Sequence, residues 1–438
     1  MTPDRRRTRQ GTHGTRVLIA GAGIGGLTAA LALDAAGIEA EVVDSARVLR
    51  PLGVGINLLP HAVRELTDLG LREALDATGL SAEQLVHFDR HGNRVWGEGR
   101  GIRLGYAWPQ YMVHRGELQM ILLAAVRERL GKDAVRTGTA VLGYEESPGG
   151  VTVRLRDQHS GAESEESADV LVGADGLHST IRRGFFPDEG APRWNGVRLW
   201  RGVTEGDPFL DGRTMAVLGT NLRTKFVCYP ISREAADRGR ALLNWLGEIT
   251  IPRDELTETA DWNRPGRLED VLPHFADWTV PWLDVPGLIG GAAEILEYPM
   301  VDRDPLPFWS RGRVTLLGDA AHPMYPLGSN GGSQAILDAR ALAFELARAD
   351  SAAAGLAAYD AARRDAVNAI VLANRNNPGD TILNTVAERA PDGFDRVGDV
   401  LTPEELAPLA NGYQHITHTD DLDRTSPWAV TPDQRRAR

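Results

Sequence analysis

The sequence has little of what secreted or membrane-spanning proteins need. It contains one cysteine among 438 residues, so no intrachain disulfide can form. Cys228 lies in the apolar run Lys225-Phe-Val-Cys-Tyr, which predicts a buried thiol rather than a reactive one. No apolar run is long enough to cross a bilayer. These absences indicate a protein of a reducing cytoplasm with no membrane partner.

Positive charge is also scarce. The chain carries 48 lysine and arginine residues against 60 aspartate and glutamate residues, which gives a formal net charge of -12. Binding to a nucleic acid would need a local basic face, and the sequence shows none. The composition, 42% hydrophobic, is that of one large globular unit or two closely packed ones.

The first residues imitate an export signal, because Arg5-Arg6-Arg7 precedes the apolar stretch Val17 to Ala36. Asp34 and several glycines interrupt that stretch, and a strand, a turn and a helix explain it better. We therefore predict that residues 1–14 form a disordered arm.

A glycine-rich turn follows the first predicted strand, residues 16–20. The turn has the form Gly21-x-Gly23-x-x-Gly26, precedes a helical pattern, and is followed by a second strand, residues 39–43, that ends at Asp44. In such βαβ units the glycines allow a tight turn, close approach of a pyrophosphate and packing of helix on strand. The acidic residue accepts hydrogen bonds from a ribose. The sequence thus predicts a dinucleotide site.

Two further turns have a similar setting. The strand Asp169 to Val172 runs into Gly173-Ala-Asp175-Gly176, with Ser179 and Arg182 opening a helix. The strand Arg313 to Leu317 runs into Gly318-Asp319, then a loop from Pro326 to Gly332, then predicted helices over residues 333–348 and 352–374. Between them, from residue 191 to about 300, aromatic-rich strands predict an inserted antiparallel sheet.

The three motifs, in this order, resemble those of the single-component FAD-dependent aromatic hydroxylases, the family of p-hydroxybenzoate and salicylate hydroxylases. Within that family, several segments are similar to phenazine-carboxylate hydroxylases. They are RPLGVGIN (50–57), HRGELQMILLAAVRERLG (114–131), VLVGADGLHS (170–179), WRGVTE (200–205), DWNRPGRLEDVLPHFADW (261–278) and YPMVDRDPLP (298–307). The resemblance covers roughly residues 16–375.

The resemblance implies an α/β fold in which a discontinuous, Rossmann-like FAD-binding domain carries an inserted, mostly antiparallel sheet as its substrate domain. We assign residues 15–84, 108–190 and 300–380 to the FAD-binding domain. Residues 85–107 and 191–299 form the substrate domain, and residues 381–438 form a C-terminal segment. The polar last twenty or so residues are predicted to be loosely held.

The resemblance also implies a set of FAD-binding residues. The resemblance implies that the first glycine turn, Asp44 and Arg115 bind the ADP half and the pyrophosphate. Many relatives carry the longer glutamate in place of Asp44. Asp175 belongs to a motif near the pyrophosphate that influences nicotinamide binding, and Asp319 binds the ribityl hydroxyls. The full set is Gly21, Gly23, Gly26, Asp44, Arg50, Arg115, Asp175, Gly318, Asp319, Pro326 and Gly331.

The loop after Asp319 admits a different interpretation, since Asp319 and His322 provide half of a metal site. Nothing nearby completes the ligand set, so we predict no metal and treat His322 as structural. The helix that begins near Ser333 points its N-terminus at the loop, where the family places the N1 edge of the flavin.

Candidate substrate contacts lie in the inserted sheet: Trp200, Arg201, Tyr229 and Trp245. Arg201 suits a carboxylate substrate. For each of the four, a purely structural role in the sheet remains open. No residue is assigned a catalytic role.

The resemblance implies a monooxygenase that uses NADH or NADPH and O2 to hydroxylate an aromatic acid through a flavin C4a-hydroperoxide, with or without loss of a carboxylate. Alternatives are an aromatic polyketide or indole hydroxylase, a Baeyer-Villiger enzyme, and a non-catalytic flavin sensor. Flavin halogenases carry a Trp-x-Trp-x-Ile-Pro run that is absent here. The sequence leaves open whether the protein is a monomer or a homodimer.

Overall fold

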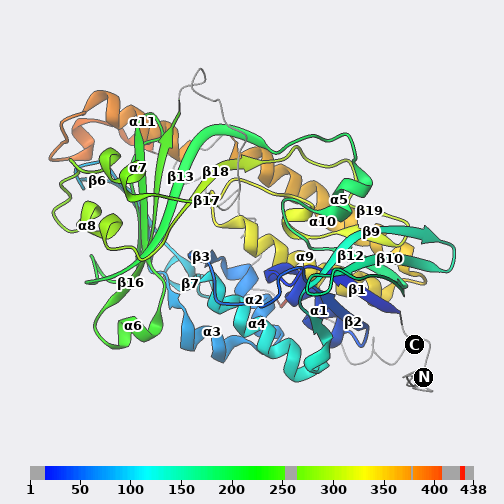
Figure 1. Ribbon diagram of the computed structural model, residues 1–438. Helices are drawn as coiled ribbons and strands as arrows, with labels where there is room; N and C mark the ends of the chain where they lie inside the picture. The colour runs from blue at the N-terminus through cyan, green and yellow to red at the C-terminus, as the bar shows by residue number, and fades with distance from the viewer. Residues whose placement is uncertain (1–14, 252–263, 376–377, 407–424, 430–438) are drawn as a thin grey trace.

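The computed structural model describes residues 15–251, 264–375, 378–406 and 425–429. The predicted disordered arm, residues 1–14, lies outside these residues, as does most of the C-terminal tail. Figure 1 shows a sheet with flanking helices on the right and a larger sheet on the left, with α9 (Asn330–Arg348) between them.

A six-stranded sheet in the described chain carries the three glycine turns. Strands β1, β2, β8, β12 and β20 run parallel, and only β19 is antiparallel to its neighbour. Its order is β19 (Ser310–Arg311), β20 (Val314–Leu316), β12 (Val170–Gly173), β1 (Arg16–Ala20), β2 (Glu39–Val43) and β8 (Val135–Arg136). The apolar side chains of β1 are at most 2% exposed, as a parallel strand covered on both faces requires.

Helices cover this sheet and form one core with it. α9 packs against α1, α2 and α10, and α1 also packs against α4. The bounds are α1 (Ile24–Ala35), α2 (Pro60–Asp68), α3 (Arg72–Thr78), α4 (Arg115–Leu130), α5 (Thr180–Phe185) and α10 (Ala352–Asn374). Short η helices lie at η1 (Gly101–Leu104), η2 (Lys132–Ala134), η5 (Gly318–Ala320) and η6 (Val397–Asp399).

Two small antiparallel sheets flank the parallel one. One has the order β3 (Gly55–Leu58), β7 (Tyr111–His114) and β4 (Leu80–Ser81). The other has the order β11 (Glu163–Ala168), β10 (Gly150–Asp157) and β9 (Thr139–Ser147).

The larger sheet has eight strands within the described ranges. All neighbours are antiparallel except β14 and β5. Its order is β17 (Arg264–Pro265), β18 (Ile295–Asp302), β13 (Arg193–Gly206), β16 (Ala241–Thr250), β15 (Thr224–Pro230), β14 (Thr214–Gly219), β5 (Gln84–Phe88) and β6 (Arg94–Gly99). The other elements are α6 (Arg233–Asp237), α7 (Leu268–Val271), η4 (Leu272–His274), α8 (Val285–Gly290) and α11 (Pro378–Arg389).

The predicted fold class is confirmed: a parallel sheet with helices and a mostly antiparallel sheet make up the α/β structure. Cys228 is fully buried, as predicted, and burial raises the pKa of its thiol. The division into domains by residue number stays a prediction.

One strand and one predicted feature of the tail need comment. Within the segment RPLGVGIN, Gly55 begins β3, because Tyr111 to His114 supplies a partner strand distant in the sequence. The last residues were expected to be loosely held, but residues 425–429 include a docked stretch. Ser426 is buried and donates a hydrogen bond of 2.6 Å to the Glu65 carboxylate. The Arg363 guanidinium lies over the Trp428 ring at 5.4 Å.

Removing the Ser426 hydroxyl tests this contact. Glu65 is fully buried and also receives a hydrogen bond of 2.9 Å from Arg340, so Ser426→Ala leaves one carboxylate oxygen with a weaker set of partners. We expect a loss of about 1–3 kcal/mol in the free energy of unfolding, measured by chemical denaturation. Thr425→Ala is the control, because Thr425 is exposed; equal stability of the two variants would show that the docked tail contributes nothing.

Candidate active site

The first glycine turn has the conformation that its sequence predicts. Gly21 has φ +110°, and a Cβ on it would lie 2.3 Å from the Ala174 carbonyl oxygen in the neighbouring turn. A Cβ on Gly26 would lie 1.9 Å from the Gly21 carbonyl oxygen. A Cβ on Gly23 would meet no atom within 4 Å, so Gly23 faces open space. The first and third glycines serve packing, and the second leaves room for a ligand.

Two helix N-termini point at this region without a side-chain cap. Neither α1, preceded by Gly23, nor α9, preceded by Ser329, has a side chain that accepts from its first turn. The long helices α4 and α10 are capped by His114 and Ser351. Uncapped N–H groups and the helix dipole attract anionic groups, so α1 and α9 present two sites for negative charge.

Asp44 lies at the end of β2 and fixes the glycine turn. Its carboxylate accepts hydrogen bonds of 2.7 Å from the backbone N–H groups of Ala22 and Ala46. The Gln119 side chain in α4 donates a hydrogen bond of 2.7 Å to the Ala22 carbonyl. Gln119 was not predicted, and nothing in its local pattern indicates this contact. Whether Asp44 also holds a ribose stays a prediction.

The Asp175 carboxylate is directed into its own turn. It accepts hydrogen bonds from the Ser179 hydroxyl at 2.5 Å and the Thr180 N–H at 2.7 Å. Burial raises the pKa of the Asp175 carboxyl, and these hydrogen bonds act in the opposite direction. The carboxylate thus holds the start of α5, and its predicted influence on a nicotinamide cofactor would act through the shape of this turn.

Arg182 joins the second turn to the third. Its guanidinium is 2% exposed and donates hydrogen bonds of 3.0 and 2.8 Å to the carbonyl groups of Ala320 and Ala321. It is also paired with Glu189. Arg182 was noted in its motif but was given no role, because its partners lie far away in the sequence.

The third turn exposes the Asp319 side chain between buried neighbours. Gly318 has φ +61° and is buried, as is Ala320, whereas Asp319 is exposed. The Asp319 carboxylate makes no hydrogen bond or ion pair with the described residues. An acceptor held in this way is suited to a ligand with hydroxyl groups.

His322 belongs to a buried polar cluster behind the turn. Its Nε2 lies 2.5 Å from the Asp338 carboxylate, which also accepts from Arg363 at 2.9 Å and from the Gly318 N–H at 3.3 Å. Burial would raise the pKa of Asp338, but its interactions with His322 and Arg363 lower it. This supports the structural role predicted for His322, and no group of three potential metal ligands occurs in the described part of the chain.

The loop between the third turn and α9 is conformationally constrained. Gly328 has φ +66° and Ser329 has φ +60°, which costs a non-glycine residue energy. Pro326 is exposed, and Gly331 faces open space in the first turn of α9. The predicted contacts of Pro326 and Gly331 therefore lie at an open surface.

Arg115 lies beside another glycine, Gly53, and Arg50 precedes that glycine in the chain. Arg115 is the first residue of α4, and a Cβ on Gly53 would lie 3.9 Å from its guanidinium. Arg50 is exposed and precedes this glycine in the chain. Neither forms an ion pair with a described acidic residue, so both are available to an anion.

The four candidate substrate contacts divide between the two faces of the large sheet. Trp200 and Trp245 are at most 1% exposed and pack with Phe226, Phe275 and other residues of the outer core. That core includes α7 and α8, so both tryptophans lie on the face away from the glycine turns. Because side chains alternate along a strand, Trp200 and Arg201 had to point to opposite faces of the sheet. The alternation does not show which of these faces is turned toward the glycine turns. This geometry gives the tryptophans a core role and disfavours a substrate contact.

Arg201 and Tyr229 lie on the inner face. An Arg201 Nη donates a hydrogen bond of 2.7 Å to the carbonyl of Gly55 in β3. Burial lowers the pKa of the Arg201 guanidinium, and the positive charge of Arg115 acts in the same direction. Burial also raises the pKa of Tyr229 to about 12. Arg201 stays charged at neutral pH and forms no ion pair with the described residues.

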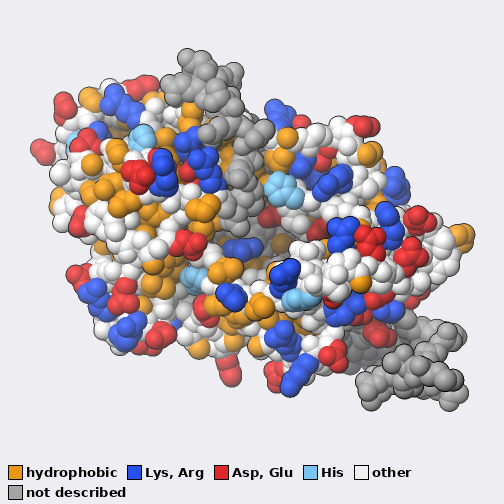
Figure 2. All heavy atoms as spheres, viewed as in Figure 1, with side chains coloured by type: hydrophobic (Ala, Val, Ile, Leu, Met, Phe, Trp, Pro, Cys, Tyr) orange, Lys and Arg blue, Asp and Glu red, His pale blue; other side chains and the backbone are white. Residues whose placement is uncertain are grey.

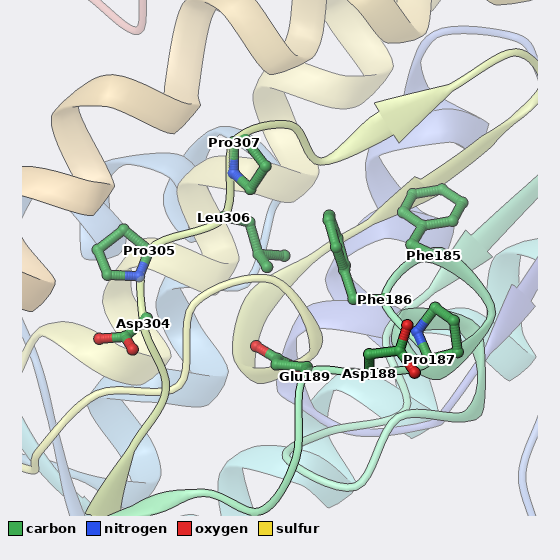
Figure 3. Close-up of a pocket in the computed structure, with 9 residues that line it drawn as sticks. All are labelled: Phe185, Phe186, Pro187, Asp188, Glu189, Asp304, Pro305, Leu306 and Pro307. Atoms are coloured by element: carbon green, nitrogen blue, oxygen red, sulfur yellow. The ribbon is translucent and has the colours of Figure 1, made fainter.

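Figure 2 shows a hollow near the middle of the face in view, with basic side chains at its rim. A separate pocket lies beyond the end of α5, where the side chains of Phe186 and Leu306 face each other (Figure 3). It contains Asp188, Glu189 and Asp304 and none of the predicted site residues. It is therefore distinct from the site that the glycine turns form.

Comparison with known proteins identifies the family. The chain matches the family model described as "FAD binding domain" over residues 14–187 and 304–374. The chain belongs to the FAD-dependent aromatic hydroxylases. It is 50% identical over 398 residues to the phenazine 1,6-dicarboxylic acid hydroxylase PhzS of Lysobacter antibioticus, covering 90% of this chain and 95% of the relative.

Other relatives of these hydroxylases agree. The chain is 36% identical to the 3-amino-4-hydroxybenzoate 2-monooxygenase PtnB3 of Streptomyces platensis, covering 78% and 82% of the two chains. The structure matches that of Klebsiella pneumoniae HpxO complexed with FAD and uric acid, with a TM-score of 0.70, 25% identity and coverage of 92% and 93%. The protein is thus an FAD-dependent aromatic monooxygenase. No described helix has the length and apolarity needed to cross a membrane.

The site of this hydroxylase fits FAD on structural grounds. Gly23 and Gly331 leave space, α1 and α9 present uncapped N–H groups, and Asp319 has no partner among the described residues. These features suit a pyrophosphate, an electron-accepting ring and a ribityl chain. Which of the predicted residues contact the cofactor stays a prediction.

Paired glycine variants test the turn. Gly26→Ala places a methyl group against the Gly21 carbonyl, so we expect a protein that is unfolded or loses several degrees of melting temperature. Gly23→Ala meets no protein atom, so it should melt like the wild type without cofactor but bind FAD at least about 10-fold more weakly. Thermal melts and FAD fluorescence titration measure both effects, and tight FAD binding by Gly23→Ala would refute the assignment of this glycine.

The His114 cap predicts a pH dependence. His114 Nδ1 accepts a hydrogen bond of 3.2 Å from the Gly116 N–H, and burial lowers the pKa of its imidazole. The unfolded chain takes up this proton at about pH 6.5 and the folded chain only at lower pH, so stability falls as the pH drops below about 6.5. Asparagine also caps helices but does not titrate. His114→Asn should therefore flatten stability measured by denaturant unfolding from pH 7 to pH 5, and parallel curves would contradict this.

Proposed function

We propose that this monooxygenase hydroxylates phenazine-type aromatic carboxylic acids and that Arg201 binds the substrate carboxylate. The observation that carries the proposal is a guanidinium on the inner face of the large sheet with no acidic partner among the described residues. Removing a charge from water costs free energy unless a counter-charge repays it. A substrate carboxylate is such a counter-charge.

The surroundings of Arg201 favour a planar acid. Arg201 lies close enough to Tyr229 and Tyr298 for their hydroxyl groups to support its charge. Both tyrosines are on the inner face, because Tyr298 pairs with Leu199, two residues from Arg201, and Tyr229 pairs with Asn244. Arginine binds carboxylates with two parallel hydrogen bonds, and tyrosine rings contact flat aromatic systems.

The relative that is 50% identical supports the same substrate class. That relative is named a phenazine 1,6-dicarboxylic acid hydroxylase, and the two chains match over 90% and 95% of their lengths. Relatives with lower identity act, by name, on amino- and hydroxybenzoates, which are also aromatic acids. A carboxylate is the group that these substrates share.

FAD, when bound and reduced, activates O2 for transfer of one oxygen atom to the aromatic ring. NADH or NADPH supplies the two electrons, and the second oxygen atom leaves as water. The protein orients the ring by the carboxylate, excludes water with the buried inner face of the sheet, and stabilises negative charge with the first turn of α9. We propose that the reaction takes place in the cytoplasm.

The first experiment identifies the product. Purified enzyme with FAD is given NADH or NADPH in turn, with phenazine-1-carboxylate, phenazine-1,6-dicarboxylate or benzoates, and products are analysed by mass spectrometry. A gain of oxygen with retention or loss of carbon dioxide distinguishes simple from decarboxylative hydroxylation. If only neutral polyketides or indoles are hydroxylated, the proposal is wrong.

Arg201→Gln tests the carboxylate contact. We expect its KM for the aromatic acid to rise on the order of 30-fold or more, equivalent to about 2 kcal/mol, because a charge-assisted pair is lost. The FAD content should be unchanged, and the corresponding neutral carboxamide should bind both enzymes about equally. Arg198→Gln is the matched control, since Arg198 lies on the same strand and pairs with Glu297. Equal KM values for Arg201→Gln and wild type would refute the role of Arg201.

A further inference from the structure

Strand β3 lies between the two large sheets. Along the edge that does not pair with β7, side chains hold it in place of another strand. β3 lies at the edge of its sheet, next to β7 only. The Gly55 N–H donates a hydrogen bond of 2.7 Å to Asn244 Oδ1, and the Gly55 carbonyl accepts one of 2.7 Å from Arg201. Unpaired edge groups usually meet water or another strand. Here Arg201 and Asn244, from adjacent strands of the large sheet, bind both groups of one residue.

Gly55 and Asn244 are in such close contact that no side chain would fit at position 55. A Cβ on Gly55 would lie 2.7 Å from Asn244 Cβ and 2.8 Å from Ile231 Cγ2. Asn244 is fully buried. The backbone of β3 therefore lies directly against the inner face of the large sheet, and a shift of Asn244 toward β3 would meet Gly55.

The next residues along the chain, in β3 and just after it, reach the N-terminus of α9. A Cβ on Gly332 would lie 2.7 Å from Ile56 Cδ1, so Ile56 packs against the first turn of the helix. The Leu59 N–H donates a hydrogen bond of 3.1 Å to the Ser333 hydroxyl. A continuous path of contacts thus runs from Arg201 and Asn244 to the helix end that fits the electron-accepting ring.

Three buried polar atoms around this contact have no partner among the described residues. They are Asn244 Nδ2, Arg201 Nε and Asn57 Oδ1. Buried polar groups are almost always hydrogen-bonded, so a bound group is expected to satisfy them. The two N–H donors suit a carboxylate oxygen, and Asn57 Oδ1 suits a water or a hydroxyl.

We propose that Asn244 is a positioning residue for the hydroxylation. It holds Gly55 beside Arg201, so that a carboxylate bound by the guanidinium fixes β3 and, through Ile56, the N-terminus of α9. Substrate binding is thereby coupled to the position of the groups that control the flavin. This inference rests on the proposed function, in which Arg201 binds the carboxylate.

Hydrogen exchange and coupling measurements on Asn244→Ala test the proposal. Exchange of the backbone N–H groups in residues 55–59 and 330–334 should become faster in the variant, and added phenazine-1-carboxylate should no longer slow it. The fraction of consumed NAD(P)H that yields hydroxylated product should fall by about 2- to 30-fold, the usual range for a lost coupling contact, with the remainder appearing as hydrogen peroxide. The affinity for FAD, measured by fluorescence, should stay within about twofold of the wild type.

Two further variants make the test specific. Asn244→Asp keeps an acceptor for the Gly55 N–H but replaces the Nδ2 donor and adds a negative charge beside Arg201, so exchange of Gly55 should stay slow while KM for the carboxylate rises. It also serves if Asn244→Ala does not fold. Val203→Ala is the control, because Val203 is paired with Asn244 in the neighbouring strand and has no polar group to offer Gly55.

The outcomes separate this inference from the proposed function. If Asn244→Ala matches Val203→Ala in exchange and coupling while Arg201→Gln loses affinity for the carboxylate, Asn244 is not a positioning residue and the proposed function stands. If Arg201→Gln retains the wild-type KM, the proposed function fails, and the inference fails with it.

Discussion

The parallel pairing of β1, β12 and β20 is the constraint on which the flavin site depends. Parallel strands bring their carboxyl ends to one edge, and here each of those ends continues into a glycine turn. The turns are tied by backbone hydrogen bonds, from Ala174 to Ala20 at 2.8 Å and from Leu317 to Gly173 at 2.9 Å. Arg182 then adds the side-chain link to Ala320 and Ala321. Three segments far apart in the sequence become one surface, and we predict that this surface binds FAD.

The sequence was most informative where one residue type alone meets a backbone requirement. Gly21 and Gly26 were predictable because a Cβ at either position would collide with a carbonyl oxygen. The strand bounds of β1 and β2 followed from short apolar runs that end at turn residues. Such requirements are local, so they leave a local signature.

Contacts that depend on tertiary placement left no such signature. Arg182 meets its carbonyl partners across 138 and 139 residues, and Asn244 meets Gly55 across 189. The alternation of β13 puts Trp200 and Arg201 on opposite faces, but only the packing of α7 and α8 decides which face is the core. Predictions of binding residues in the large sheet therefore divided evenly between the inner and the outer face.

The site also contains a positive charge without an acidic partner in the described part of the chain, whereas many arginines elsewhere in the protein form ion pairs. Most buried arginines here are paired, as Arg340 is with Glu65 and Arg363 with Asp338. Arg201, which is half-buried, has no acidic partner among the described residues, in a chain whose net charge is -12. A cation held without its counter-ion is costly in the free protein, and the same cost favours binding of an anion. At Arg201, the feature that lowers the stability of the free protein is thus the one that favours binding of an anionic substrate.

The order of the strands along the chain has a consequence for biosynthesis. β20 and α9 complete the cofactor surface, but the ribosome makes them only after the whole eight-stranded sheet, since β13 begins at Arg193 and β18 ends at Asp302. Until then one edge of β12 has no neighbouring strand. Pairing β12 with β20 joins parts of the chain that are far apart in the sequence, which is slow and costs chain entropy. FAD can therefore meet the complete surface only after α9 has been synthesised, and its binding then stabilises the assembled fold.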